Sequence, residues 1–282
     1  MTTELSRRRR LKHAILRSRI PLRGVVARGY LRAVELYRTI RGARERSSAM
    51  NGSLAIPSAR LRVLVAGTAT VDCFLTSGRV QAEYLRELLA GVGKPIEETD
   101  AILDFGCGCG RISRWFSDLA GPQLSGCDYN RELVTWCQAH LRFMDTQATR
   151  LHPPLPYPDN SFDFVYAYSV FTHLSVELAA RWMSELRRIV KPGGLMWFTI
   201  HGESYRERLL PEEKVRFDEG EIVVWLPEAQ GTNICGAYWP NAAVERMLGD
   251  GFATLTHLDP QVDKSTAEKA HLQHDAYLVR RL

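Results

Sequence analysis

The chain has 282 residues, of which 45% are hydrophobic and 24% are charged. This composition is typical of one main folded domain with additions. No apolar run approaches the roughly 20 residues of a bilayer span, and no signal-peptide core follows the first arginines. Six cysteines are scattered without a CxxC pair, so we expect a reducing, cytoplasmic location and no disulfide scaffold.

The net charge of +5 is distributed unevenly along the chain. Residues 1–46 hold thirteen arginines and one lysine against three glutamates, a net charge of +11. Apolar residues recur among the arginines at helical spacing, which predicts a basic amphipathic helix within an extension at residues 1–58. Such a helix suits docking on its own domain, self-association, or peripheral contact with an anionic membrane surface; the stretch also resembles an organelle transit peptide. The acidic remainder offers no track for nucleic acid.

Strand-like and helix-like segments then alternate along the chain. Residues 59–99 form a lead-in, with strand-like alternation at 61–66 and helical spacing at 78–89. Further strands are predicted at 101–105, 123–127, 143–149, 162–168 and 195–200, and helices from the glycines after 105 to about 119, at 130–141 and at 175–190. This alternation predicts an α/β fold, a doubly wound parallel sheet with helices on both faces.

The alternation breaks after His201. Residues 203–238 combine prolines, a charged run and one strand-like piece at 222–226, which indicates an insertion over the site. A helix is predicted at 241–248, and strands at 252–257 and 274–280. Because no helix is predicted between these two strands, we expect them to pair antiparallel at the sheet edge.

A glycine turn follows the strand at 101–105, in the sequence "ILDFGCGCGR". A dinucleotide-binding turn, G-x-G-x-x-G, would need a third glycine where Arg111 stands, which argues against a nicotinamide cofactor. Asp104, two residues before the first glycine, would repel a diphosphate but attract an ammonium group. Asp128 ends the next strand, where a carboxylate can accept hydrogen bonds from two ribose hydroxyls. The turn therefore predicts a ligand with a cationic amino-acid part and a ribose.

Two cysteines, Cys107 and Cys109, alternate with these glycines. A Cys-x-Cys pair without nearby histidines is poor zinc-binding spacing. We therefore interpret both as small packing residues and expect no metal.

Four stretches, "ILDFGCGCGR", "LSGCDYN", "LPYPDNSFDFVYAYSVFTHL" and "ELRRIVKPGGLMWFTI", resemble the class I S-adenosylmethionine-dependent methyltransferases in order and spacing. The resemblance implies a Rossmann-like, seven-stranded sheet with an antiparallel last strand, within a domain at 100–282, and S-adenosylmethionine as cofactor. "SVFTHL" and the lead-in "VAGT…FLTSG" resemble, more narrowly, bacterial methyltransferases of uncertain substrate, some of them associated with polysaccharide biosynthesis. The resemblance places the cofactor site at Asp104, Gly106, Cys107, Gly108, Gly110, Asp128, Tyr129, His152 and Tyr168. His152 is included by analogy with the family's adenine pocket, although "ATRLHPPLPY" departs from the usual pattern there.

Methyl transfer to a hydroxyl needs an aligned nucleophile and a base within hydrogen-bond reach. His173 follows the fourth strand of the domain and His201 ends the fifth, so both are candidate bases; a capping or packing role for His173 is the alternative. Tyr168, Tyr205 and Trp239 are candidates to line the acceptor pocket.

The absence of two motifs from the sequence narrows the range of acceptor classes. The fourth strand is not followed by the Asn/Asp-Pro-Pro-Tyr block of nucleobase methyltransferases, and no Pro-Cys pair offers a thiolate nucleophile. We predict methyl transfer to a hydroxyl of a small molecule, sugar or glycan. The alternatives are a non-catalytic S-adenosylmethionine-binding scaffold and, less well supported, a nicotinamide oxidoreductase.

Overall fold

The computed structural model describes residues 54–282 together with residues 25, 29, 32–33, 36–37 and 39–40. Its centre is a seven-stranded sheet with the order β3-β2-β1-β4-β5-β9-β8. The strands are β1 (Ala101–Phe105), β2 (Gln123–Asp128), β3 (Asp145–Ala148), β4 (Phe162–Ala167), β5 (Val190–Ile200), β8 (Phe252–Leu258) and β9 (Asp275–Arg281). β9 runs antiparallel to both neighbours, while β1 to β5 pair in parallel. The predicted α/β sheet with an antiparallel last strand is confirmed.

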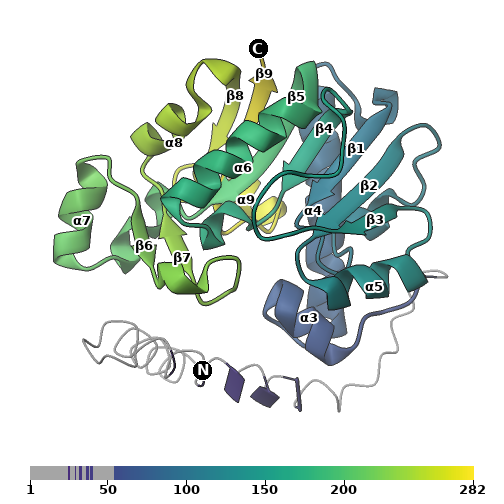
Figure 1. Cartoon of the computed structure of the whole chain (residues 1–282), viewed down its shortest axis with the longest axis horizontal. Helices are drawn as coiled ribbons and strands as arrows, with labels where there is room; N and C mark the ends of the chain where they lie inside the picture. The colour runs from purple at the N-terminus through teal and green to yellow at the C-terminus, as the bar shows by residue number, and fades with distance from the viewer. Residues whose placement is uncertain (1–24, 26–28, 30–31, 34–35, 38, 41–53) are drawn as a thin grey trace.

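Helices cover both faces of this sheet (Figure 1). Apolar residues of α6 (Val176–Ile189) and α8 (Asn241–Leu248) form one core layer with one face of the strands. The other layer contains α4 (Val71–Gly91), the 3₁₀ turn η2 (Ser113–Phe116), α5 (Arg131–His140) and α9 (Lys264–Lys269). Burial on both faces explains the nearly continuous apolar runs of the central strands. The carboxyl ends of the parallel strands meet at one edge of the sheet, where open α/β sheets bind their ligands.

The lead-in differs from its prediction. Residues 61–66 belong to helix α3 (Ala59–Ala66) and not to a strand. Ser58 Oγ accepts a hydrogen bond from Leu61 N at 3.4 Å, and Gly67 ends the helix in the left-handed conformation with φ 64°. These two caps stabilise a helix over a stretch whose apolar alternation alone favours a strand.

Two further local predictions were wrong. The stretch after the glycine turn forms only η2, because Ser113 and Arg114 both turn inward: Ser113 bonds Asp104, and Arg114 donates to the carbonyl of Ala55 at 2.7 Å. A regular amphipathic helix would expose one side of this segment, whereas most of it is buried. The strands β8 and β9 are also separated by a short helix, α9, yet they pair antiparallel as predicted.

The insertion forms a small layer of its own beside the sheet (Figure 1). It consists of η4 (Glu203–Arg208), α7 (Pro211–Asp218), β6 (Val223–Trp225), η5 (Pro227–Ala229) and β7 (Gly236–Tyr238). β6 and β7 pair with each other, antiparallel and apart from the main sheet. Both ends of the insertion meet at His201, which forms an isolated bridge with Tyr238 and accepts a hydrogen bond from Trp239 N at 2.8 Å.

Most of the basic amphipathic helix predicted within residues 1–58 lies outside the described residues. The described positions in it are helical, and the apolar side chains of Val25, Leu36, Tyr37 and Ile40 are exposed. Among the described residues no single helix has the length and composition to span a bilayer; α3 and α4 meet that criterion only as a pair, bent by 44°.

Candidate functional site

The glycine turn connects β1 to η2 at the carboxyl edge of the sheet. The backbone N–H groups of Gly106 and Cys107 donate to the carbonyl oxygen of Cys127 at 2.8 and 3.0 Å, which ties the turn to β2. Gly106, Gly108 and Gly110 have φ values of 82°, 57° and 66°. This left-handed region is costly for any residue with a Cβ atom, so the turn requires glycine for its conformation alone.

Neighbouring side chains close tightly on these glycines. A Cβ atom on Gly106 would lie 2.5 Å from Val170 Cγ2, and one on Gly108 would lie 2.7 Å from Val65 Cγ2. Val65 belongs to α3, so the lead-in helix reaches the turn. The turn therefore presents bare backbone between two apolar side chains.

Asp104 lies near the end of β1 and is 4% exposed. Its Oδ2 accepts a hydrogen bond from Ser113 Oγ, which lies 2.9 Å from the hydroxyl of Tyr166. Burial raises the pKa of Asp104 to about 7, against the lowering effects of Ser113, Tyr166 and Arg111. No salt bridge to this carboxylate occurs among the described residues. Its charge is therefore poorly compensated, and a ligand ammonium group would supply what is missing.

Asp128 ends β2 on the same face as Asp104. The register pairs Asp104 with Gly126, and side chains alternate along a strand, so the residue two positions after Gly126 faces the same side. Its two carboxylate oxygens accept hydrogen bonds from Gly108 N at 3.0 Å and Asn130 N at 2.8 Å. Burial raises the pKa of Asp128 despite these bonds. The two acids thus flank the glycine turn from one side.

The far end of this edge is covered by the insertion. A Cβ atom on Gly231 would lie 2.5 Å from Leu151 Cδ1 and 3.7 Å from the Tyr129 ring. Asn233 Nδ2 donates to the carbonyl oxygen of Leu64 in α3 at 3.0 Å. We call residues 227–235 the strap, because this segment connects the ends of β2 and β3 to α3.

Tyr129, predicted to contact the cofactor, and His152, predicted by analogy at the adenine pocket, lie in different surroundings. Tyr129 is 42% exposed beside the strap. The side chain of His152 is exposed, and its neighbour Leu151 makes the contact with the strap instead.

The strap also holds His173. The ring Nδ1 lies 2.7 Å from the carbonyl oxygen of Cys235, and Gly231 N donates to the His173 carbonyl oxygen at 2.7 Å. A carbonyl oxygen only accepts, so Nδ1 carries the proton and Nε2 carries the lone pair of the neutral ring. The cap of α6 is Ser175, whose Oγ accepts from Leu178 N at 3.3 Å, so capping does not account for His173.

His201 lies in a cluster of rings at the same edge. Its ring stacks on Tyr205 with centroids 4.4 Å apart, and lies 5.0 Å from His274 and 6.2 Å from His173. His274 directly precedes β9. Because β9 is antiparallel, it begins at the carboxyl edge of the parallel strands. The predicted antiparallel pairing could therefore have placed His274 at this edge.

His274 is a site residue that the sequence analysis missed. Its Nδ1 is buried, and no hydrogen-bond partner for it occurs in the described part of the chain. Burial lowers the pKa of His274 to about 3, and the positive charges of Arg208 and Arg111, together with that of His173 when it is protonated, add to this effect. The ring is therefore neutral at physiological pH and offers a hydrogen-bonding atom at the site.

Tyr168 connects this cluster to the glycine turn. Its ring centroid lies 5.7 Å from that of His274, and the guanidinium of Arg111 lies 4.6 Å from the ring centroid. Trp239, in contrast, does not line the edge: it is 1% exposed within the core, and its Nε1 donates to the Phe171 carbonyl oxygen at 3.2 Å. The prediction for Trp239 was wrong because its ring fills the layer beneath the insertion.

The cysteines of the turn are packing residues in this structure. Cys107 and Cys109 are buried. A hydrogen bond with Cys137 and then burial raise the pKa of the Cys107 thiol, and burial raises that of Cys109. Within the described residues, no group of His, Cys, Asp or Glu is arranged to hold a metal ion.

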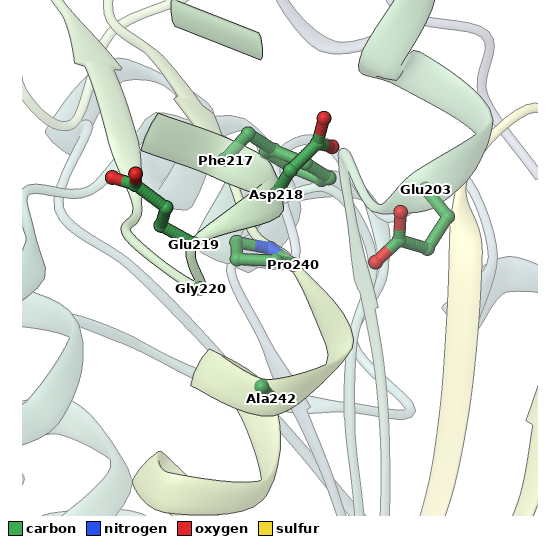
Figure 2. Close-up of a pocket in the computed structure, with 7 residues that line it drawn as sticks. All are labelled: Glu203, Phe217, Asp218, Glu219, Gly220, Pro240 and Ala242. Atoms are coloured by element: carbon green, nitrogen blue, oxygen red, sulfur yellow. The ribbon is translucent and has the colours of Figure 1, made fainter. Parts of the chain in front are cut away.

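A separate cavity of about 310 Å³ lies between α7 and the start of α8, away from this edge (Figure 2). It is lined by Glu203, Phe217, Asp218, Glu219, Gly220, Pro240 and Ala242. Asp218 is already paired with Arg206, and Glu203 accepts from Asn241 N at 3.1 Å. We assign this cavity no role in the site.

Comparison with known families agrees with the geometry of the edge. Residues 103–198, from β1 to β5, match the family described as "Methyltransferase domain". The chain therefore contains a class I S-adenosylmethionine-dependent methyltransferase domain, and S-adenosylmethionine is the cofactor of that class. The buried carboxylate of Asp104, which forms no salt bridge within the described residues, fits the ammonium group of this cofactor, and the bare backbone of the glycine turn fits a ligand bound close to it.

Curated relatives share the domain and not their full length. An uncharacterised methyltransferase of Schizosaccharomyces pombe is 31% identical over 144 residues, which cover 44% of this chain and 51% of the relative. A sterol 24-C-methyltransferase of Gibberella zeae is 30% identical over 129 residues, covering 42% of this chain and 32% of the relative. The methyltransferase GfsG of Streptomyces halstedii is 26% identical, covering 45% of each chain. The chain spans about half the length, or less, of these relatives.

Solved structures show the same fold at low identity. The protein PH0226 of Pyrococcus horikoshii has a TM-score of 0.52 and 18% identity, covering 72% of this chain and 90% of its own. The methyltransferase CcbJ of Streptomyces caelestis has a TM-score of 0.50 and 15% identity, covering 73% of this chain and 95% of its own.

Proposed function

We propose that this protein transfers the methyl group of S-adenosylmethionine to a hydroxyl group of a small molecule, sugar or glycan. The observation that carries the proposal is the pair of carboxylates, Asp104 and Asp128, on one face beside a glycine turn, next to a histidine with a fixed tautomer. The cofactor supplies an electrophilic methyl group when bound. The chain's own residues must then hold the cofactor, orient the acceptor and accept its proton.

The cofactor would lie along the carboxyl edge of β1 and β2. Asp104 suits its ammonium group, and Asp128 suits the ribose hydroxyls, because Asp104 is buried, Asp128 is half-buried, and both carboxylates are already oriented by the hydrogen bonds described above. The glycine turn between them lets the ligand approach the backbone closely. Tyr129 and Leu151, beside the strap, would border the adenine base of the cofactor. The exposed His152 is a weaker candidate for this contact.

His173 is the better of the two candidate bases. The bond from its Nδ1 to the Cys235 carbonyl oxygen orients the ring and raises the electron density on Nε2, the atom that would accept the acceptor's proton. His201 lies 6.2 Å from it, between Tyr205 and His274, and we assign it to acceptor contact.

The strap belongs to this proposal as a lid. It contacts His173, Tyr129, Leu151 and α3 at once, so it would exclude water from both the cofactor and the reacting hydroxyl. A base oriented by the lid's own carbonyl group would be fully placed only when the lid is closed.

A screen tests the function and the base together. Purified protein is given S-adenosylmethionine and a panel of hydroxyl-bearing metabolites, sugars and glycans, and formation of S-adenosylhomocysteine is measured. H173N retains a group at the Nδ1 position for Cys235 but lacks Nε2, so we expect kcat to fall about 10²- to 10⁴-fold with cofactor affinity unchanged. H140N, on the exposed end of α5, is the control. Normal turnover by H173N would show that His173 is not the base.

The alternative of a non-catalytic scaffold is decided by the same screen. Tight binding of S-adenosylhomocysteine by calorimetry, without transfer to any acceptor, would favour it. Binding of NAD in place of S-adenosylhomocysteine would revive the oxidoreductase alternative. The cytoplasmic location, and the membrane or self-association role of residues 1–58, stay predictions.

A further inference from the structure

A line of aromatic and basic side chains extends from the glycine turn to the insertion. Its members, in order, are Arg111, Tyr168, His274, His201, Tyr205 and Arg208. Adjacent ring centroids in this line lie 4.4 to 5.7 Å apart, and a guanidinium lies over the ring at each end, at 4.6 Å for Arg111 and 3.9 Å for Arg208. The cofactor half of the site is at the Arg111 end, so the Arg208 end is left for the acceptor.

Arg208 differs from the other basic residues of the insertion. Arg206, two positions earlier, pairs with Asp218 and Glu207, and Lys214 pairs with Glu207. In the described part of the chain no carboxylate lies within salt-bridge distance of Arg208. Arg208 is an exposed residue, and its guanidinium is held over the Tyr205 ring. An arginine held flat on an aromatic ring, with its donors not engaged by an acid, is a common arrangement for binding carboxylate or phosphate.

Positive charge lies at both ends of the line. Arg208 and Arg111 both act on His274 and lower its pKa, while the carboxylate of Asp275 acts on Tyr205. The nearest acid in sequence, Asp275, is fully buried and is engaged by Ser204 and, at 3.4 Å, by His257. A neutral or cationic acceptor would leave this positive charge uncompensated.

We propose that the acceptor carries an anionic group, a carboxylate or a phosphate. Arg208 binds this group, while the hydroxyl group of the acceptor faces His173. This inference rests on the proposed function and narrows its acceptor class. The aromatic rings between the two ends suit a planar or ring-shaped body, which would pack on His201, because Tyr205 is itself covered by Arg208 and His201. An uncharged sterol would leave Arg208 without a partner.

The test compares acceptors that share a ring and differ in one anionic group. The probes are 4-hydroxybenzoate with its methyl ester, and glucuronate and glucose 6-phosphate with glucose, so that carboxylate and phosphate are separate arms. Two readouts are used with each probe: S-adenosylhomocysteine formation, and calorimetric binding to the protein saturated with S-adenosylhomocysteine. We expect at least one anionic probe to bind or react about tenfold better than its neutral partner.

Variants of Arg208 and of the nearby Arg206 test whether Arg208 causes the preference for anionic probes. R208M should abolish the discrimination between charged and neutral probes, R208K should restore part of it, and R206M should leave it unchanged. The proposal is overturned if neutral probes react equally well, if no anionic probe binds below about 10 mM, or if R208M keeps the preference. Equal reaction of neutral probes would still support methyl transfer, whereas failure to bind S-adenosylhomocysteine would refute the proposed function itself.

Discussion

The two halves of the site are built in different ways. The cofactor half comes from one short stretch, from Asp104 to Asp128, and is made largely of backbone: positive φ angles, N–H groups and the ends of two adjacent strands. The acceptor half comes from four separate segments, at 168–173, 201–208, 235–238 and 274, and is made of side chains. Substitutions in the cofactor half would alter the backbone conformation that forms it. Substitutions in the acceptor half can replace one side chain at a time and leave the backbone as it is.

Breaking the backbone half should have the largest effect. Gly108→Ala forces an alanine into a φ of 57° and brings its Cβ to within 2.7 Å of Val65. We expect the turn to shift and S-adenosylhomocysteine to bind on the order of 100-fold more weakly. Calorimetry measures the affinity, and thermal unfolding measures the accompanying loss of stability, about 1 to 3 kcal/mol.

Gly93→Ala is the matched control. Gly93 also has a positive φ, 74°, but no atom lies within 4 Å of the position of its Cβ, at the end of α4. It should lose stability similarly and keep full cofactor affinity. Equal weakening of binding by both variants would show that general strain, and not the turn, sets the affinity.

The charge of Asp104 makes the stability of the cofactor half depend on pH. With its pKa raised from 3.8 to about 7, the folded protein binds this proton more tightly than the unfolded chain. Asp104 therefore contributes decreasing stability as the pH rises from about 4 to about 7. Asp104→Asn should unfold at a higher temperature than wild type at pH 8, with a smaller difference at pH 5, when both are measured without cofactor.

Cofactor binding should show the opposite trend. Wild type should bind S-adenosylhomocysteine more tightly as the pH rises from about 5.5 to about 7.5, because the carboxylate ionises while the ligand ammonium group stays charged. Asp104→Asn should bind about tenfold more weakly at pH 7.5 and with little pH dependence. A pH-independent affinity in wild type would contradict the contact between Asp104 and the ammonium group.

Asp163 is the control for the stability trend. Burial raises its pKa, but the hydrogen bonds from Lys191 and from two backbone N–H groups outweigh burial and lower it. Asp163→Asn should therefore lose stability relative to wild type at neutral pH, and this loss should shrink as the pH falls below about 4.

How far the sequence predicts each half follows from this difference in construction. The strand, turn and acid of the cofactor half are neighbours in the chain, so their spacing indicates their geometry directly. His274 and Arg208 become candidate site residues only because the fold brings β9 and η4 to the same edge of the sheet. No periodic pattern marks Arg208 within the irregular insertion. The helix α3 was missed for a local reason, since its caps at Ser58 and Gly67 outweighed an apolar alternation.

Loosening the strap should have the smallest effect. Asn233→Ala removes the hydrogen bond from the strap to the Leu64 carbonyl oxygen, an exposed contact worth about 1 kcal/mol. We expect S-adenosylhomocysteine to bind about two- to fivefold more weakly, as measured by calorimetry. Glu228→Ala, an exposed change in the same segment, should leave the affinity as it is. No loss in Asn233→Ala would argue that the strap does not close over the cofactor.

The meeting of both ends of the insertion at His201 has a consequence for how the protein can diverge. Tyr238 and Trp239 return the chain to the residue from which it departed, so the length or sequence of the segment between can change without altering the register of β5 with β9. A graft of a foreign segment between Gly202 and Ala237 would therefore exchange the acceptor-facing surface and the strap, while the sheet and the glycine turn stay unchanged.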